Sequence, residues 1–438
     1  MKKLIFFLAA GLMCISARAQ FQGKQRYNVN EDNRTVKEYG RMVVDTLAKR
    51  YFHGRGYLKE GDVKSAYFVA SELYKFGLQR FKSAPTFYQN FNLSVNTFPD
   101  DAFLAFDEHF LTCGADFVPG AGCPSIKGTY GLAWLDSITL STEQNFKDFS
   151  NRSFRDVFVV MDDKGITGEE SKKVFQNMMK NPFGAKGLIV LKDKVLWTVA
   201  TDTSAFPIME VVRGKVSRSD QQVRLQVKSK FEPNFINRNV IAYVEGKEVP
   251  DSFIVVSAHY DHLGQIGRLV YFPGANDNAS GIAMMLSLAR HFSKKENQPK
   301  YSIAFIGFAA EEAGLIGSKK YVFAPIVPLE KTKFLLNLDI MGTGDEGITV
   351  VNATEFGREF SILDSINKKE QLLPQIRQRG PAANSDHYYF YEKGVRCFFV
   401  YTMGGIKAYH DIYDRGETLP LTEFEDVHRL FVQFIGKL

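Results

Sequence analysis

The second half of the chain contains apolar runs of strand length in which hydrophobic residues follow one another without alternating polar positions. These runs cover residues 239–246, 253–260, 301–310, 334–341, 347–352 and 397–402. Continuous hydrophobicity is typical of strands whose two faces are both covered by helices. A helix-like stretch at residues 281–295 separates two of the runs. We therefore predict an α/β fold with an open, mostly parallel twisted sheet and helices on both faces.

The N-terminal part has a helical pattern. Residues 34–52 and 61–81 carry apolar side chains at three- and four-residue spacing, which predicts two amphipathic helices. Residues 86–95 then alternate in the manner of a strand.

A smaller β-rich or α+β insert is predicted from about residue 100 to residue 215. Short apolar runs at residues 156–161, 187–191 and 196–200 alternate there with turn-rich segments. One hypothesis is that this insert is a lid over a substrate site. The predicted division of the chain is residues 1–19 as a signal peptide, 20–99 as a segment packed on the main domain, 100–215 as the insert, and 216–438 as the main α/β domain.

The first nineteen residues have the organisation of an export signal. Two lysines precede an apolar stretch that is too short to span a bilayer, and an Ala-Arg-Ala ending is typical of a cleavage site. We expect cleavage between Ala19 and Gln20 and an exported protein, periplasmic or extracellular. No later apolar run is long enough to cross a membrane, so no membrane insertion is expected.

The charge of the chain is mild. The formal net charge is +6, and loss of the basic signal residues leaves about +3. This value does not favour nucleic acid or an anionic membrane as a partner.

Three cysteines remain after the signal. Cys113 and Cys123 are close enough in sequence for a local disulfide in an oxidising compartment, a pairing that the sequence leaves open. Cys397 lies inside an apolar run and is interpreted as a buried small hydrophobe.

Ionisable residues gather after the predicted strands. They are His259 and Asp261 after the second run, Glu311 and Glu312 after the third, Asp339 after the fourth, His410 beyond the sixth, and Asp277 in a Gly- and Asn-rich turn before the helix. Ligands of open α/β sheets bind beyond the carboxyl ends of the strands, so we expect these side chains to meet at one edge.

Two imidazoles and several carboxylates suit zinc. The set is too large for one ion with an open position, and it fits two ions about 3.5–4 Å apart that share a bridging carboxylate and a water. Such cations would also remove the repulsion between Glu311 and Glu312. One of these two carboxylates would then bind metal, and the other would take a proton from the water.

Five segments together resemble a known family. They are "SAHYDHLG", "GANDNASG", "AAEEAGLIGS", "LNLDIMG" and "YHDIYD", which in this order and spacing resemble the M28 metallopeptidases, the co-catalytic zinc aminopeptidases. The resemblance covers residues 235–420. More loosely, "GRGY", a helix and "YQNF" resemble the N-terminal segment of that family, and the insert is similar to a protease-associated domain.

The resemblance implies a role for each residue of the set. His259 and Asp339 would bind one zinc, Glu312 and His410 would bind a second, and Asp277 would bridge both ions. The implied activity is that of an exported aminopeptidase that removes N-terminal residues from peptides.

Three further residues receive roles by the same comparison. Glu311 would be the general base toward the metal-activated bridging water and then the acid toward the leaving amine. Asp261 would orient the His259 imidazole, and His387, in "SDHYYF", is a candidate contact to substrate. Arg396 stands where many relatives have proline, which puts the local shape of the cleft in doubt.

Asp277 has a competing structural interpretation, whereas burial favours a metal role for Asp339. Asp277 precedes a helix and would cap it, but Asn278 or Ser280 serves that purpose equally well. Asp339 follows a buried strand, where an unpaired carboxylate would cost a large desolvation free energy.

The alternatives are a glutaminyl cyclase-like transferase with one zinc, a carboxypeptidase of the same superfamily, and a non-catalytic binding protein. The intact ligand set counts against the last of these. Side-chain specificity and oligomeric state stay open.

Overall fold

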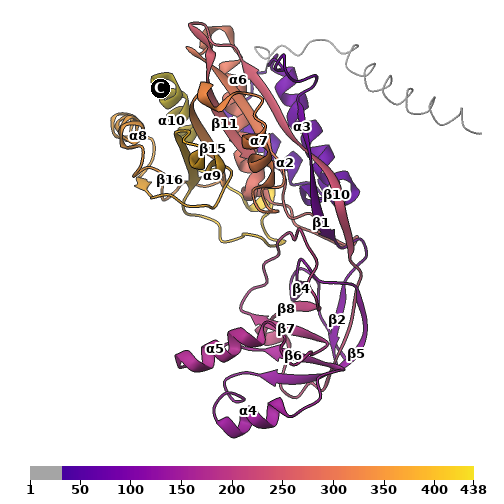
Figure 1. Ribbon diagram of the computed structural model, residues 1–438. Coiled ribbons are helices and arrows are strands. Elements are labelled where there is room, and N and C mark those ends of the chain that lie inside the picture. The colour runs from indigo at the N-terminus through magenta and orange to yellow at the C-terminus, as the bar shows by residue number, and fades with distance from the viewer. Residues whose placement is uncertain (1–31) are drawn as a thin grey trace, which may run out of the picture.

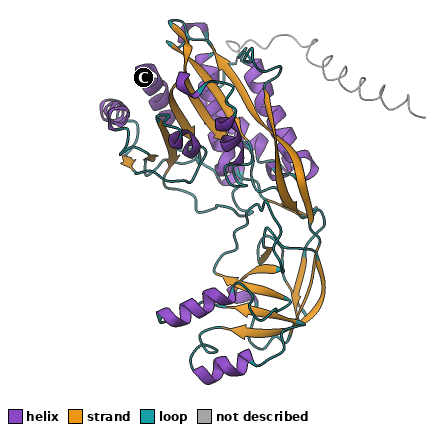
Figure 2. Cartoon of the chain, viewed as in Figure 1, coloured by secondary structure: helices purple, strands orange, loops and turns teal. Residues whose placement is uncertain are grey.

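The chain forms two lobes, each built around its own sheet (Figure 1). The computed structural model describes residues 32–438, and the predicted export signal lies outside the described residues. Strands dominate the lower lobe, and helices cover the sheet of the upper lobe (Figure 2). Over residues 32–438, no helix combines the length and the apolar character needed to cross a bilayer.

Among the described residues, eight strands form the sheet of the upper lobe, which we call the main lobe. Their order is β1-β10-β14-β11-β15-β18-β16-β17. The four central strands β14, β11, β15 and β18 are parallel, and antiparallel pairs lie toward the edges. The prediction of a mostly parallel α/β sheet is therefore confirmed. The strands are β1 (Tyr88–Thr97), β10 (Lys230–Val244), β11 (Val249–His259), β14 (Tyr301–Phe308), β15 (Thr332–Leu338), β16 (Ile348–Val351), β17 (Ile376–Gln378) and β18 (Cys397–Thr402).

Helices cover both faces of this sheet, which explains the continuous apolar runs. Along β11, Ile254 and Val256 pack in one core cluster, and Phe253 and Val255 pack in another on the opposite face. The first cluster includes side chains of α2 (Val36–Leu47), α3 (Gly61–Lys75), α6 (Gly281–Phe292), α8 (Gly357–Glu370) and α10 (Phe424–Lys437). The second includes side chains of α7 (Ile316–Phe323) and α9 (His387–Glu392). A strand between two such layers needs apolar residues at every position.

The predicted N-terminal helices are present as α2 and α3, and the predicted strand is β1. The first turn of α2 carries a capping box, in which the Thr35 hydroxyl accepts from the Glu38 N–H and the Glu38 carboxylate accepts from the Thr35 N–H. Strand β1 pairs with β10, so this N-terminal segment is part of the main lobe.

The second lobe has its own mixed sheet, in the order β3-β2-β9-β5-β6-β7-β8-β4. Its elements are β2 (Phe103–Phe106), β3 (His109–Phe110), β4 (Phe117–Pro119), β5 (Ile126–Leu135), α4 (Glu143–Ser150), β6 (Val157–Met161), α5 (Glu169–Met178), β7 (Gly187–Lys192), β8 (Ile208–Val212) and β9 (Gln222–Val227). Strand β9 pairs with β2 and β5, so the lobe extends to Val227, beyond the predicted boundary at residue 215. A hairpin of the main lobe, β12 (Gln265–Ile266) with β13 (Val270–Tyr271), packs against this lobe.

Residues 196–200 do not form a strand, contrary to the prediction. Val195 and Trp197 are buried in the core of the second lobe, but the backbone N–H of Trp197 donates to the main lobe. The apolar character of this run reflects burial without a strand partner. The similarity of the insert to a protease-associated domain stays a prediction.

All three cysteines of the described residues are free thiols. The local disulfide between Cys113 and Cys123 is therefore not formed. Cys397 is fully buried in β18, as expected for a small hydrophobe. Burial raises the pKa of each thiol to about 12, so these thiols are poor nucleophiles.

Candidate metal centre

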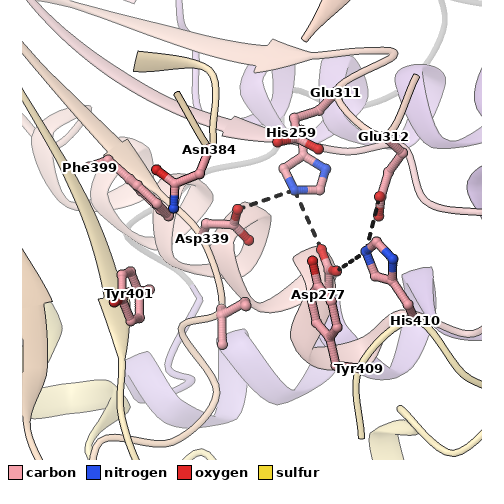
Figure 3. A pocket seen from close by; sticks show the side chains of 11 residues that line it. His259, Asp277, Glu311, Glu312, Asp339, Asn384, Phe399, Tyr401, Tyr409 and His410 are labelled. Atoms are coloured by element: carbon pink, nitrogen blue, oxygen red, sulfur yellow. Dashed lines mark ion pairs between the residues drawn. The ribbon is translucent and has the colours of Figure 1, made fainter. Parts of the chain in front are cut away.

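A pocket opens at the carboxyl ends of the central strands of the main lobe (Figure 3). The residues that line it are His259, Asp277, Glu311, Glu312, Asp339, Ile340, Asn384, Phe399, Tyr401, Tyr409 and His410. All five predicted metal ligands and Glu311 are among them. The strand ends thus bring together residues that lie up to about 150 positions apart, as the sheet topology requires.

His259, the last residue of β11, presents one ring nitrogen to two carboxylates. Its Nδ1 lies 3.2 Å from the carbonyl oxygen of Asp261, which can only accept a hydrogen bond. The neutral ring therefore carries its proton on Nδ1 and leaves a lone pair on Nε2. This Nε2 lies 3.5 Å from Asp277 Oδ1 and 3.5 Å from Asp339 Oδ2.

His410 makes the corresponding arrangement on the other side of Asp277. Its Nε2 lies 3.2 Å from Asp277 Oδ2 and 3.1 Å from Glu312 Oε2. The two carboxylate oxygens of Asp277 therefore face different histidines. We call His259 with Asp339 the first ligand group and His410 with Glu312 the second, with Asp277 shared between them.

The donor atoms of both groups form one compact cluster. Those of His259, Asp277 and Glu312 lie within 4.8 Å of one another, as do those of His259, Glu311 and Asp339. The first of these sets contains a residue of each group, so we assign the groups from the shorter contacts given above. Oδ1 of Asp339 is buried without a hydrogen-bond partner among the described residues. Lone pairs and carboxylates that crowd together in a buried space repel unless cations lie between them, and imidazole with carboxylate oxygen is a donor set that zinc accepts.

Asp261 holds the loop that carries the two glutamates. Its carboxylate accepts from the backbone N–H of Glu311 at 3.2 Å and from that of Glu312 at 3.3 Å. Its own carbonyl oxygen faces His259, so one residue positions both the end of β11 and the loop after β14. The imidazole of His262 lies 2.7 Å from Glu312 Oε1 and steadies that carboxylate from behind.

The environments of the two glutamates drive their pKa values apart. Burial raises the pKa of Glu311 well above its usual range; the opposing attraction of His259 does not cancel this effect. Burial also acts on Glu312, but His410 and His262 beside its carboxylate lower its pKa well below the usual range. Such a separation is typical of one carboxylate that carries protons and another that stays anionic.

The turn before α6 presents Asp277 to the pocket through contacts of its neighbours. The side chain of Asn278 accepts from the Gly281 N–H at 2.9 Å and so serves the first turn of the helix. The Asp414 carboxylate accepts from the N–H groups of Asn276 and Asp277, at 2.8 and 2.9 Å. The Asp277 carboxylate is therefore free of a capping role.

Arg55 connects this turn to the end of β11 through hydrogen bonds to both segments. Its fully buried guanidinium donates to the carbonyl oxygens of Tyr260 at 2.8 Å, Pro273 at 2.6 Å, Gly274 at 2.7 Å and Asp277 at 3.0 Å. Burial lowers the pKa of Arg55 to about 10, so the group stays charged at neutral pH. Arg55 lies in the "GRGY" segment, and its contacts place the residues that follow His259 next to Asp277.

Replacement of Arg55 by methionine should lower the free energy of unfolding by about 3 kcal/mol or more, because it removes buried hydrogen bonds to the carbonyl groups of this turn and of Tyr260. Urea unfolding of the mature chain measures the effect. Arg41→Met is the matched control, since Arg41 also donates to two carbonyls, of Gly416 and Leu419, but its side chain is 32% exposed. Water can replace its hydrogen bonds, so equal losses in the two variants would contradict this account.

His387 does not lie on the pocket wall, so the predicted substrate contact is not seen. The ring is buried and stacks on Phe399 with 5.1 Å between ring centroids, and Phe399 itself faces the pocket. Arg396 is not among the residues that line the pocket and pairs with Glu359 of α8 at 2.7 Å. The position that departs from the family therefore does not alter the pocket wall.

Sequence reasoning missed the roles of Arg55, Asp414 and His262. All three act on the backbone or the back of a ligand residue, and none has a spacing that signals such a contact. The signal that was present is their position inside or beside the quoted segments "GRGY", "YHDIYD" and "SAHYDHLG".

A mostly parallel α/β sheet with histidines and carboxylates at its carboxyl edge defines the zinc-exopeptidase type of fold. Residues 239–435 match the family model of peptidase family M28.

Two relatives and one solved structure illustrate the likeness. Aminopeptidase YwaD of Bacillus subtilis is 29% identical over 221 residues, which are 48% of this chain and 47% of that protein. A glutamate carboxypeptidase 2 homolog of Caenorhabditis elegans is 30% identical over 203 residues, 41% of this chain and 25% of that protein. The matches thus span about half or less of the relatives' lengths. The structure of BSAP, a zinc aminopeptidase from Bacillus subtilis, has the same fold, with a TM-score of 0.68 and 20% identity over 92% of this chain and 95% of that one.

Proposed function

We propose that this protein is a zinc-dependent aminopeptidase that binds two zinc ions per chain and releases N-terminal residues from peptides. The observation that carries the proposal is the position of Asp277, whose two carboxylate oxygens face the two ligand groups separately. Glu311 lines the same pocket and lies beside His259 and Asp339 of the first group.

The first ligand group would hold one ion and the second group the other, with Asp277 common to both. Zinc bound in this way would polarise the scissile carbonyl and make a water more acidic. The buried carboxylates around the pocket would balance the positive charge of the ions.

Glu311 carries the proton in the proposed hydrolysis. Its carboxylate takes a proton from the attacking water as the C–O bond forms, and it gives that proton to the amine nitrogen as the C–N bond breaks. Burial raises the pKa of Glu311, which makes its carboxylate a stronger base than that of an exposed glutamate. The hydrogen bond from the Glu311 N–H to Asp261 keeps the base in place during both steps.

The choice of an aminopeptidase rests on the named relatives, because two of the three are aminopeptidases. The carboxypeptidase homolog keeps release of C-terminal residues as the second candidate. The pocket lining that carries no proposed metal ligand includes Ile340, Phe399 and Tyr401. This lining suits an apolar substrate side chain whether the N-terminal or the C-terminal residue is released.

The test compares one short peptide with a free N-terminus and its N-acetylated form, using the zinc-loaded mature protein. We expect the free peptide to be cleaved at its first bond and the acetylated one at least roughly 100-fold more slowly. A zinc chelator should abolish cleavage and added zinc should restore it. Equal rates on both peptides would exclude the proposal, and mass spectrometry of the products would identify C-terminal release or pyroglutamate formation.

A further inference from the structure

The loop that carries His410 differs from the segments that carry the other ligands. His259 ends a strand and Asp339 directly follows one, but His410 comes eight positions after the end of β18. Residues 403–409 belong to no helix or strand. His410 itself has a left-handed backbone, with φ of 51°. The sheet therefore does not by itself set the position of this ligand.

Three consecutive residues of this loop contact the second lobe. The carbonyl oxygen of His410 accepts from the N–H of Trp197 at 2.9 Å. The carboxylate of Asp411, which is 2% exposed, pairs with the ammonium group of Lys194. The side chain of Ile412 packs against the apolar core of the second lobe.

The segment that makes these contacts is itself held firmly. The indole Nε1–H of Trp197 donates to the carbonyl oxygen of Pro119 at 3.0 Å within the second lobe. The same ring stacks on Phe272 of the main lobe, with centroids 4.8 Å apart and planes 22° apart. Lys194 also donates to the carbonyl oxygen of Lys407, so it grips the loop on both sides of His410.

We infer that the second lobe positions His410, with Lys194 and Trp197 as positioning residues for the second ligand group. The lobe lies outside residues 239–435, which match the family, yet it contacts a proposed ligand directly. Among the described residues, those that line the pocket all lie between positions 259 and 410 of the main lobe. The lobe therefore acts through the backbone of a ligand and does not wall the pocket as a lid would.

The test is Lys194→Met, with Lys194→Arg as the conservative variant and Lys215→Met as the matched control. Lys194 is 46% exposed, so its loss should leave the fold intact. Lys215 is 42% exposed and pairs with Asp116 at 3.0 Å inside the second lobe, an ion pair that does not include the His410 loop. Because the zinc consequence rests on the proposed function, hydrogen exchange of residues 406–414 is measured alongside zinc titration of the apo-protein against a competing chelator.

In Lys194→Met we expect faster hydrogen exchange in residues 406–414 and roughly 10-fold weaker binding of the second zinc, with the first zinc unchanged. Lys194→Arg should restore both, and Lys215→Met should match the unaltered protein in both. Unchanged exchange and unchanged zinc affinity in Lys194→Met would overturn the inference, and so would equal effects in Lys215→Met. Failure of the proposed function gives a different pattern: the unaltered protein would bind no zinc, while exchange would still respond to Lys194→Met.

Discussion

Substitution of Glu311 by glutamine is expected to lower kcat by about 10³-fold or more while both zinc ions stay bound. Glutamine keeps the shape of the side chain and the backbone hydrogen bond from residue 311 to Asp261, so the loop should not move. The glutamine side chain cannot accept a proton from the water and return it to the amine, and this is the function that the variant loses. Steady-state kinetics and zinc analysis of the purified variant measure the two quantities.

Glu312→Gln is the matched comparison, because it makes the same change from carboxylate to amide at the adjacent residue. The Glu312 carboxylate lies between His262 and His410 at 2.7 and 3.1 Å, and its pKa is held low by those rings. This variant should lose zinc from the second ligand group. If Glu311→Gln loses zinc as well, or keeps its rate, then Glu311 is a ligand or a bystander and not the proton carrier.

Substitution of Asp277 by asparagine is expected to lower the affinity for each of the two zinc ions by roughly 100-fold or more and to abolish turnover. Each oxygen of this carboxylate faces a different histidine, and an amide offers only one oxygen and no charge. The turn itself should persist, since Asp414 and Arg55 contact the backbone N–H and carbonyl groups of residue 277, which the substitution does not change.

Asp339→Asn separates the shared ligand from one that serves a single group. Asp339 pairs with His259, a member of the first ligand group. Its substitution should therefore weaken the binding of one zinc ion and leave the binding of the other unchanged. Zinc titration of the two apo-variants gives the stoichiometry and the affinities. Loss of the same single ion in both variants would show that Asp277 is not shared.

Much of the fold was accessible from the pattern of apolar residues. The six apolar runs of the second half all contain strands of the main sheet, because strands covered on both faces must be apolar throughout. The weaker predictions concern the second lobe. Residues 196–200 are apolar for a different reason, the burial of Trp197 between the lobes. Strand β9 alternates exposed and buried positions, a pattern that predicts a strand but not its sheet; only its pairing with β5 places it in the second lobe.

The candidate site was accessible to a similar extent. Residue type and position in the chain identified the six histidines and carboxylates that line the pocket, and the family resemblance supplied their proposed roles. His387 does not line the pocket: its segment reaches the pocket through Asn384, while His387, in α9, stacks on Phe399. Sequence spacing does not resolve which way such a side chain faces.

The sequence by itself determined the central strands, the identity of the candidate ligands and the edge of the sheet at which they gather. Hydrophobic periodicity is a local property, and strands joined by helical crossovers run parallel, with their carboxyl ends at one edge. Only the tertiary structure decided that Asp277 lies between two histidines, that Arg55 holds the carbonyl of Tyr260 from 205 residues away, and that Lys194 of the second lobe grips the His410 loop. Contacts of this kind depend on how distant segments are packed together, and no periodicity along the chain encodes them.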